Sequence, residues 1–173
     1  MKLIELLTET GTTEKRSIGK ENTLTRSLKK TTKQSTIMIR LKPVLDKFNP
    51  DYKDVSLIIS SALKNKIDPT LAIAVVIIES SFRKNAIHHN RDGSEDYGYF
   101  QLNGRWHKQH KNNLAQHIET GVKYLEWCLK SSERNEARAL SLYNTGSKDA
   151  PIGRRYANKV LSVKKQLDKA LKN

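Results

Sequence analysis

The chain has 173 residues and a formal net charge of +14, which indicates one compact domain and a basic protein that seeks a polyanionic partner. The candidates are nucleic acid, anionic lipid and the acidic polymers of a bacterial wall. Its single cysteine, Cys128, excludes an internal disulfide, and no apolar run approaches the ~18 residues of a membrane span.

Residues 1–9 predict a short amphipathic helix with Leu3, Leu6 and Leu7 on one side. The apolar run is too short for a secretory signal. The segment resembles the capsid-targeting leaders of internal head proteins in large tailed phages, which are trimmed after a hydrophobic-x-Glu triplet, and residues 7–9 fit that triplet. An ordinary frayed helix explains the same residues, so both interpretations stay open.

The next segment, residues 12–42, contains nine Lys or Arg, two Glu and ten Ser or Thr, and its apolar residues are too scattered to form a face. This composition favours a flexible arm. The arm either contacts the phosphates of nucleic acid without sequence preference, or it is a solvated linker with no partner. We therefore expect a basic arm over residues 1–45 and a folded domain over residues 46–173.

Two helices are expected to open the domain. Asn49 and Pro50 predict the start of a helix that extends to about residue 66. Asp68 and Pro69 predict the start of a second helix, which is wholly apolar over residues 71–78. Because a helix without a polar face belongs inside the protein, we expect this one at its centre.

Glu79 ends this apolar helix, where burial and the negative end of the helix dipole both disfavour its charged form. We therefore expect a raised pKa, as a general acid near neutral pH requires. Further along, Asp92 and Gly93 predict a tight hairpin turn. A hairpin beside the helix end would place Asp96 across a cleft from Glu79, which is the two-carboxylate layout used in glycoside cleavage.

Three more helices follow in the sequence. Residues 113–130 carry an apolar stripe that we interpret as core. Asn135 and Gly146 predict the two ends of the next helix. Pro151 and Gly153 predict a turn before a final amphipathic helix. The predicted fold class is α+β and mainly helical, with five or six helices and one small β-hairpin.

Three motifs carry a resemblance to a known family. Glu-Ser-Ser-Phe at residues 79–82, together with residues 92–106, resembles the active-site segment of c-type lysozymes and equally that of soluble lytic transglycosylases. Ala-Leu-x-x-Tyr-Asn-x-Gly at residues 139–146 and Tyr-x-x-x-Val-Leu at residues 156–161 look like signatures of the transglycosylases, which c-type lysozymes lack. The resemblance covers about residues 50–165 and implies a lysozyme-like fold.

The resemblance also implies roles for individual residues. Glu79 would be the catalytic acid and base, and Asp96 the second catalytic carboxylate, although an Asp in a hairpin often serves only to bond the backbone amides of the turn. No cofactor is implied. His107 and His110 could share a helical face, but nothing nearby completes a metal ligand set, so we expect no metal site. The implied substrate-binding residues are Ser80, Gln101, Asn103, Trp106, Tyr143, Asn144 and Tyr156.

Some of these assignments have structural alternatives. Ser80 can be positional, Tyr156 can have a structural role, and Trp106 can either stack on a sugar ring or cover the core.

The function expected from these features is cleavage of the β-1,4 bond between N-acetylmuramic acid and N-acetylglucosamine in peptidoglycan, with 1,6-anhydromuramoyl ends as products. One alternative is a hydrolytic muramidase, and another is a basic DNA-associated internal virion protein that keeps the fold for binding. The expected setting is a phage virion that opens the host periplasm or cell wall during genome entry, in contact with phage structural proteins. An endolysin that stays in the host cytoplasm until lysis, or an enzyme of a secretion system, are the alternatives.

Overall fold

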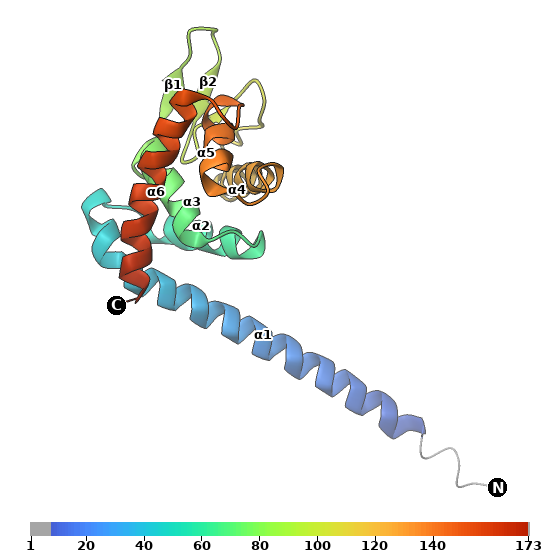
Figure 1. Ribbon diagram of the computed structural model, residues 1–173. Coiled ribbons are helices and arrows are strands. Elements are labelled where there is room, and N and C mark those ends of the chain that lie inside the picture. The colour runs from blue at the N-terminus through green and yellow to red at the C-terminus, as the bar shows by residue number, and fades with distance from the viewer. Residues whose placement is uncertain (1–7, 173) are drawn as a thin grey trace, which may run out of the picture. The chain divides into compact units, whose positions relative to one another are not determined.

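The computed structural model describes residues 8–172, and the chain divides between Ile37 and Met38 into two compact units. Helix α1, Thr8–Leu45, begins the described part (Figure 1). Six α-helices, one 3-10 helix and a three-stranded sheet make up these described residues. The expected mainly helical α+β class is confirmed.

Residues 8–45 of the expected basic arm form helix α1, which the sequence analysis did not predict. Thr31, Thr32 and Thr36 each donate from Oγ1 to the carbonyl four residues earlier, at 2.9 to 3.1 Å. These hydroxyls therefore bond within the helix instead of competing with it. The leader expected at residues 1–9 falls largely on residues 1–7, which lie outside the described residues, and it stays a prediction, as does the flexibility of the arm.

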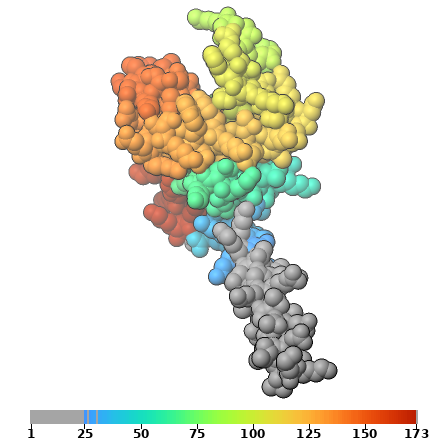
Figure 2. Space-filling model, turned by 90° about the vertical axis from the view of Figure 1, so that its right-hand side faces the viewer, coloured from blue at the N-terminus to red at the C-terminus, as the bar shows by residue number. Residues whose placement is uncertain are grey.

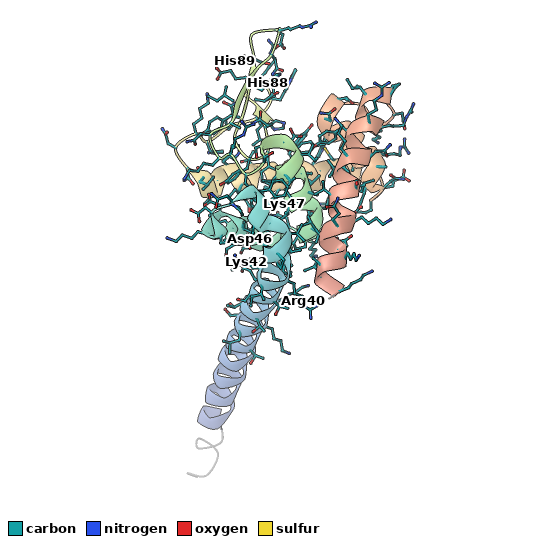
Figure 3. All side chains as sticks on the ribbon, turned by 90° about the vertical axis from the view of Figure 1, so that its left-hand side faces the viewer. Arg40, Lys42, Asp46, Lys47, His88 and His89 are labelled. Atoms are coloured by element: carbon teal, nitrogen blue, oxygen red, sulfur yellow. The ribbon has the colours of Figure 1, made fainter. Side chains whose placement is uncertain are left out.

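The second compact unit begins at Met38 and so includes the last turns of α1, whereas the expected domain began at residue 46. The reason is that Leu41 and Leu45 are fully buried. Beyond them, Asp46 opens the 3-10 helix η2, Asp46–Phe48. Its Oδ1 accepts from Lys42 Nζ at 2.7 Å and from the Tyr52 hydroxyl at 2.6 Å. Figure 3 shows Lys42 and Asp46 close together at this end of α1.

Helix α2, Tyr52–Lys64, confirms the expected helix but starts slightly later. Its N-cap is Asp51, whose carboxylate accepts from the Lys53 backbone N–H at 2.9 Å. Asn49, the expected cap, instead ends η2 with a φ of 46°. A short 3-10 turn in front of the helix therefore moved the cap by two residues.

Helix α3, Pro69–Ser80, begins where the sequence predicted, with Asp68 as the N-cap and Pro69 as the first residue. Every residue from Thr70 to Ile77 is buried, and α2 and α6 pack against the helix (Figure 1). The expected central position is therefore confirmed. The helix ends at Ser81, which has a φ of 50°, so Glu79 lies in its last turn.

The sheet is antiparallel in the order β1-β2-β3, with strands Ile87–His89, Glu95–Tyr97 and Leu102–Asn103. Residues 90–94 form the hairpin loop between β1 and β2, closed by the Asn90 N–H donating to the Ser94 carbonyl at 2.8 Å. The third strand was not predicted, because two residues are too few to show an alternating pattern. Its pairing places Asn103 beside Asp96.

Helices α4, Leu114–Ser131, α5, Glu136–Thr145, and α6, Pro151–Lys172, complete the fold. The predicted ends of α5 are confirmed. The predicted turn at residues 151–153 is wrong, because Pro151 begins α6 and Gly153 lies inside it. A Cβ at Gly153 would approach Ser141 Oγ to 2.2 Å, so the glycine is what allows α6 to pack closely on α5.

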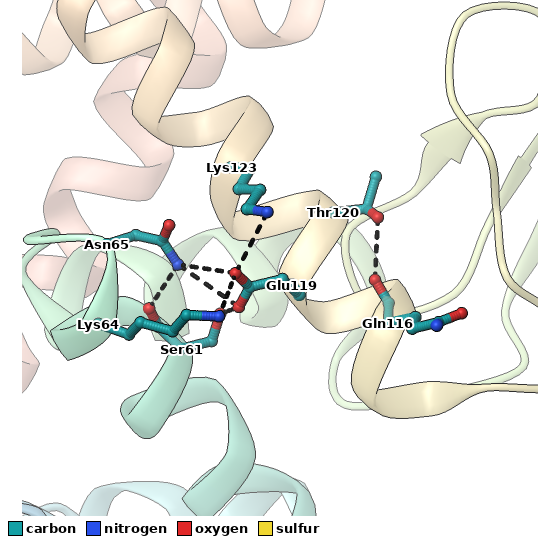
Figure 4. A network of polar contacts seen from close by, with 7 residues as sticks. All are labelled: Ser61, Lys64, Asn65, Gln116, Glu119, Thr120 and Lys123. Atoms are coloured by element: carbon teal, nitrogen blue, oxygen red, sulfur yellow. Dashed lines mark hydrogen bonds and ion pairs between the residues drawn. The ribbon is translucent and has the colours of Figure 1, made fainter.

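A polar cluster joins α2 to α4 (Figure 4). Glu119 accepts from the Ser61 hydroxyl at 2.7 Å and from Lys64 Nζ at 2.9 Å, and Lys123 lies 3.5 Å away. Burial raises the pKa of Glu119, but the bonds from Lys64 and Ser61 outweigh this effect and lower the pKa to about 2. No helix among the described residues is long and apolar enough to cross a bilayer.

Candidate active site

A cleft of about 500 Å³ opens between the sheet, with the loop that follows it, and the C-terminal end of α5, with Tyr124 of α4 beside that end. Figure 2 shows it as a hollow between the yellow-green residues of the hairpin and the orange residues of α5. Both predicted carboxylates, Glu79 and Asp96, line it. The remaining lining residues are Asn90, Gln101, Leu102, Asn103, Trp106, His107, Tyr124, Tyr143, Asn144, Thr145 and Gly146.

Glu79 has the electrostatics that the sequence predicted. Its side chain is only partly exposed, at the negative end of an otherwise buried helix. Burial is the main cause that raises the pKa of its carboxyl group to about 7, and the charge of Asp96 adds to the rise. A hydrogen bond from Tyr156 acts in the opposite direction. The carboxyl group is therefore about half protonated near neutral pH, which suits both an acid and a base.

Tyr156 is the residue that fixes the position of this carboxyl group. Its hydroxyl donates to Glu79 Oε1 at 2.5 Å from a side chain that is only 8% exposed. Tyr156 does not itself line the cleft. Because burial and the nearby Glu79 charge raise its own pKa well above the usual value, Tyr156 keeps its proton and remains a donor. Its hydroxyl therefore contacts the Glu79 carboxyl group from outside the cleft lining, and its predicted part in substrate binding stays a prediction.

Tyr143 occupies the neighbouring position, with its ring stacked against that of Tyr156 at 6.5 Å between centroids. Its hydroxyl donates to the Phe100 carbonyl at 2.7 Å. This bond ties α5 to the loop between β2 and β3. Tyr143 therefore both lines the cleft and holds its two sides together, whereas Asn144 beside it is exposed and also lines the cleft.

Asp96 approaches the cleft from the opposite side, on strand β2. The alternative role considered for it, bonding the amides of the hairpin turn, belongs to a different residue. Asp92 Oδ1 accepts from the Ser94 N–H at 3.0 Å and from the Ser94 hydroxyl at 2.7 Å. Among the described residues no hydrogen bond or ion pair is made by the Asp96 carboxylate, which leaves it available to a substrate.

Gln101 and Asn103 both line the cleft, yet each uses part of its amide to hold the loop. Gln101 Nε2 donates to the carbonyls of Ala86 and Gly98, at 3.1 and 2.8 Å. Asn103 Nδ2 donates to the Ser94 hydroxyl at 2.9 Å, and its Oδ1 accepts from the Arg105 N–H at 2.9 Å. These two residues therefore shape the sheet side of the cleft. Among the side-chain bonds of the described residues none uses Gln101 Oε1, so this oxygen is left for a ligand.

The other predicted residues are divided between the cleft and the core. Trp106 is 76% exposed and lines the cleft, so it does not cover the core and is available for stacking. Ser80 is buried, and its hydroxyl donates to the carbonyls of Val76 and Tyr99 at 3.0 and 3.1 Å. Ser80 is therefore in a position to anchor the end of α3 and does not reach the cleft.

Six lining residues were not among the predicted site residues, namely Asn90, Leu102, His107, Tyr124, Thr145 and Gly146. Tyr124 and His107 are the two of them with aromatic rings. Tyr124 was assigned to the core stripe of α4, and it does pack on Tyr143 at 4.9 Å between ring centroids, but one side of it opens on the cleft. His107 packs on Tyr124 at 4.3 Å, and burial lowers the pKa of its imidazole, so the ring is neutral near pH 7. A stripe position cannot distinguish a core residue from one at the edge of a cleft.

A metal site has no support within residues 8–172, which contain no cluster of three or more His, Cys, Asp or Glu side chains that could hold an ion. His107 and His110 lie in an irregular segment, not on one helical face. His88 and His89 are exposed on β1, and His89 pairs with Glu95 at 3.2 Å (Figure 3).

Comparison with known proteins agrees with this arrangement. The model of the transglycosylase SLT domain matches residues 56–160. A lysozyme C of Takifugu rubripes is 64% identical over 28 residues, which cover 16% of this chain and 20% of that protein. No solved structure matches the chain. The matched domain includes both carboxylates, the cleft and Tyr156.

Proposed function

The chain belongs to the transglycosylase SLT domain family, and from this premise we propose that it cleaves the glycan strands of peptidoglycan as a lytic transglycosylase. The observation that carries the proposal is the raised pKa of Glu79, about 7, in a cleft that faces a second carboxylate. An acid with this pKa donates a proton and takes it back at the same pH. A transglycosylase needs both steps from one residue.

In the first step protonated Glu79 donates its proton to the glycosidic oxygen between N-acetylmuramic acid and N-acetylglucosamine. The bond from C1 of the muramoyl sugar to that oxygen breaks, and the released sugar leaves with a new hydroxyl group. Positive charge develops at C1 and its ring oxygen. The Asp96 carboxylate, across the cleft, stabilises this charge because it has no other partner among the described residues.

In the second step the muramoyl 6-hydroxyl attacks C1, and ionised Glu79 accepts the hydroxyl proton. A bond from O6 to C1 forms the 1,6-anhydro product, and Glu79 is protonated again for the next cycle. Tyr156 assists here, since its hydroxyl donates to the Glu79 carboxylate and stabilises the ionised form between the two steps. No water is consumed.

Hydrolysis is the second candidate. It is favoured by the unpartnered Asp96 carboxylate and by the short stretch shared with a lysozyme C. In that case water replaces the 6-hydroxyl as the attacking group, and the product has a reducing end.

Mass spectrometry of the muropeptides released from purified peptidoglycan distinguishes the two reactions. The wild type is expected to release products that are lighter by one water than the products of hydrolysis. Glu79→Gln should not release them. Products with reducing ends would show that the enzyme is a hydrolytic muramidase and not a transglycosylase. Release of no muropeptide from peptidoglycan of several wall chemistries would contradict both candidates and favour the third, a protein that keeps this fold for binding.

We also propose a phage virion as the setting, where the enzyme opens the host periplasm or wall. The support is the basic composition of the chain and the leader-like residues at its start. The nucleic-acid contact is tested with Lys29→Gln combined with Lys33→Gln, two exposed lysines of α1. Weaker binding of duplex DNA at low salt, with unchanged muropeptide release, is expected. Equal DNA binding by both proteins would contradict the contact.

A further inference from the structure

A continuous row of aromatic rings leads from the catalytic acid to the protein surface. Tyr156, which bonds Glu79, stacks on Tyr143 at 6.5 Å between centroids. Tyr143 contacts Tyr124 at 4.9 Å. Tyr124 in turn lies 5.9 Å from Trp127, with an angle of only 13° between the two ring planes. The row therefore ends at Trp127, one helical turn beyond the last tyrosine that lines the cleft.

Trp127 is an unusual member of this row because it is 53% exposed and does not line the cleft. Its neighbours along α4, Leu125 and Cys128, are fully buried, so the core of this helix is complete without it. A tryptophan presents a large apolar surface. Half of that surface is left in water directly next to the cleft wall.

The charged side chains on either side of Trp127 take part in ion pairs. Lys130 pairs with Glu126 at 2.9 Å, and Lys123 lies 3.5 Å from Glu119. The indole therefore presents a flat aromatic face between these ion pairs. Such a face suits an uncharged ring with apolar C–H groups on one side, as an N-acetylated sugar has, and does not suit a phosphate.

We propose that Trp127 is an outer sugar-binding platform for the same glycan strand that the cleft cleaves. The occupant is an N-acetylhexosamine ring of that strand, stacked on the exposed face of the indole. Continuity with the cleft supports this, because Tyr124 lines the cleft and stacks on Trp127. The inference rests on the proposed function and extends it from the bond that is cut to the length of strand that is held.

The platform predicts a dependence on strand length. A strand long enough to reach both Glu79 and Trp127 gains the stacking contact, whereas a short oligosaccharide bound in the cleft does not. One sugar–aromatic contact of roughly 1 kcal/mol corresponds to about a fivefold to tenfold effect on affinity. We therefore expect the ratio of kcat/KM for long strands to that for short oligosaccharides to fall by about this factor in Trp127→Ala.

Three variants make the test specific. Trp127→Phe keeps an aromatic face and should retain most of the ratio. Ile152→Ala removes another exposed apolar side chain, 67% exposed and outside the cleft lining, and should leave the ratio unchanged. An unchanged ratio in Trp127→Ala would overturn the platform, whether kcat/KM stays the same or falls equally on long and short substrates. Either result would point instead to a partner protein or to a role in folding.

A binding measurement separates this inference from the proposed function. Glu79→Gln protein is titrated with purified long glycan strands, with and without Trp127→Ala in the same chain. About fivefold to tenfold weaker binding of the double variant is the expected result. If wild type released no muropeptide but the double variant still bound strands more weakly, the proposed catalysis would fail and the platform would stand. Equal binding by the two proteins would overturn the platform even in an active enzyme.

Discussion

The two sides of the cleft hold their carboxylates in contrasting ways. Glu79 comes from the last turn of a buried helix, has a tyrosine hydroxyl bonded to it, and has a pKa raised to about 7. Asp96 comes from a short strand of a small sheet and has no bonding partner among the described residues. The difference shows how one cleft can separate the roles of two similar groups, because only Glu79 has a bonded partner and a raised pKa.

The largest loss of activity is expected from replacing Glu79, the carboxyl group on the helical side of the cleft. Glu79→Gln removes the cleft carboxyl group whose pKa of about 7 suits it to donating and accepting the proton, so muropeptide release should fall by about 10²-fold to 10⁴-fold. Glu126→Gln, which breaks a surface ion pair on α4, is the matched control and should retain activity. Release by Glu79→Gln within tenfold of wild type would contradict the assignment of the acid.

Replacing Asp96, the carboxylate on the sheet side of the cleft, should lower activity less. Asp96→Asn removes the negative charge that stabilises the developing cation, and we expect about a 10-fold to 10²-fold loss of kcat. Its charge also helps to raise the pKa of Glu79, so the basic limb of the pH profile of kcat/KM should move to lower pH. Glu95→Gln, a neighbour on the same strand that pairs with Lys111, is the control. A profile that moves to higher pH would contradict the electrostatic coupling.

Tyr156→Phe tests the hydrogen bond from the Tyr156 hydroxyl to the Glu79 carboxyl group. Its hydrogen bond lowers the pKa of Glu79, so removing it should raise that pKa and move the basic limb to higher pH, opposite to Asp96→Asn. A loss of kcat of roughly tenfold is expected from one hydrogen bond to a charged group.

Tyr143→Phe is the matched control for this prediction, since its hydroxyl bonds the Phe100 carbonyl and not the acid. It should lower stability by about 1 kcal/mol without moving the profile of kcat/KM. The same displacement in both variants would show that the aromatic layer, and not the Tyr156 hydroxyl, sets the pKa.

The smallest effect concerns stability and compares Glu79 with Glu119, a carboxylate that has cationic partners. The pKa of Glu119 is lowered from 4.5 to about 2, so its stabilisation is present above pH 4.5 and is lost as pH falls toward 2. The pKa of Glu79 is raised from 4.5 to about 7, so ionisation destabilises the fold as pH rises through this interval.

Thermal unfolding at several pH values measures both signs. Glu119→Gln should destabilise by about 1 kcal/mol at pH 7 and show little difference at pH 2. Glu79→Gln should raise the melting temperature at pH 8 relative to wild type, with a smaller difference at pH 4. Equal shifts at all pH values would contradict the cited pKa directions.

The sequence by itself determined the local parts of this molecule. Asp68 followed by Pro69 fixed the start of the central helix, and Asn135 and Gly146 fixed the ends of α5, because a cap acts over three or four neighbouring residues. The apolar run before Glu79 also predicted the raised pKa, since a helix apolar on all sides must be buried. Motifs identified the family without any contact being known.

Only the tertiary structure decided how these parts meet. Tyr156 bonds Glu79 from 77 positions along the chain, and Asp96 is available because Asp92 caps the hairpin turn in its place. The same holds for Gly153, a predicted turn residue that proved to be the contact point of two helices. Periodicity and capping describe neighbours in sequence, whereas contacts between distant residues depend on how the helices pack, and the electrostatics of the cleft follow from that packing.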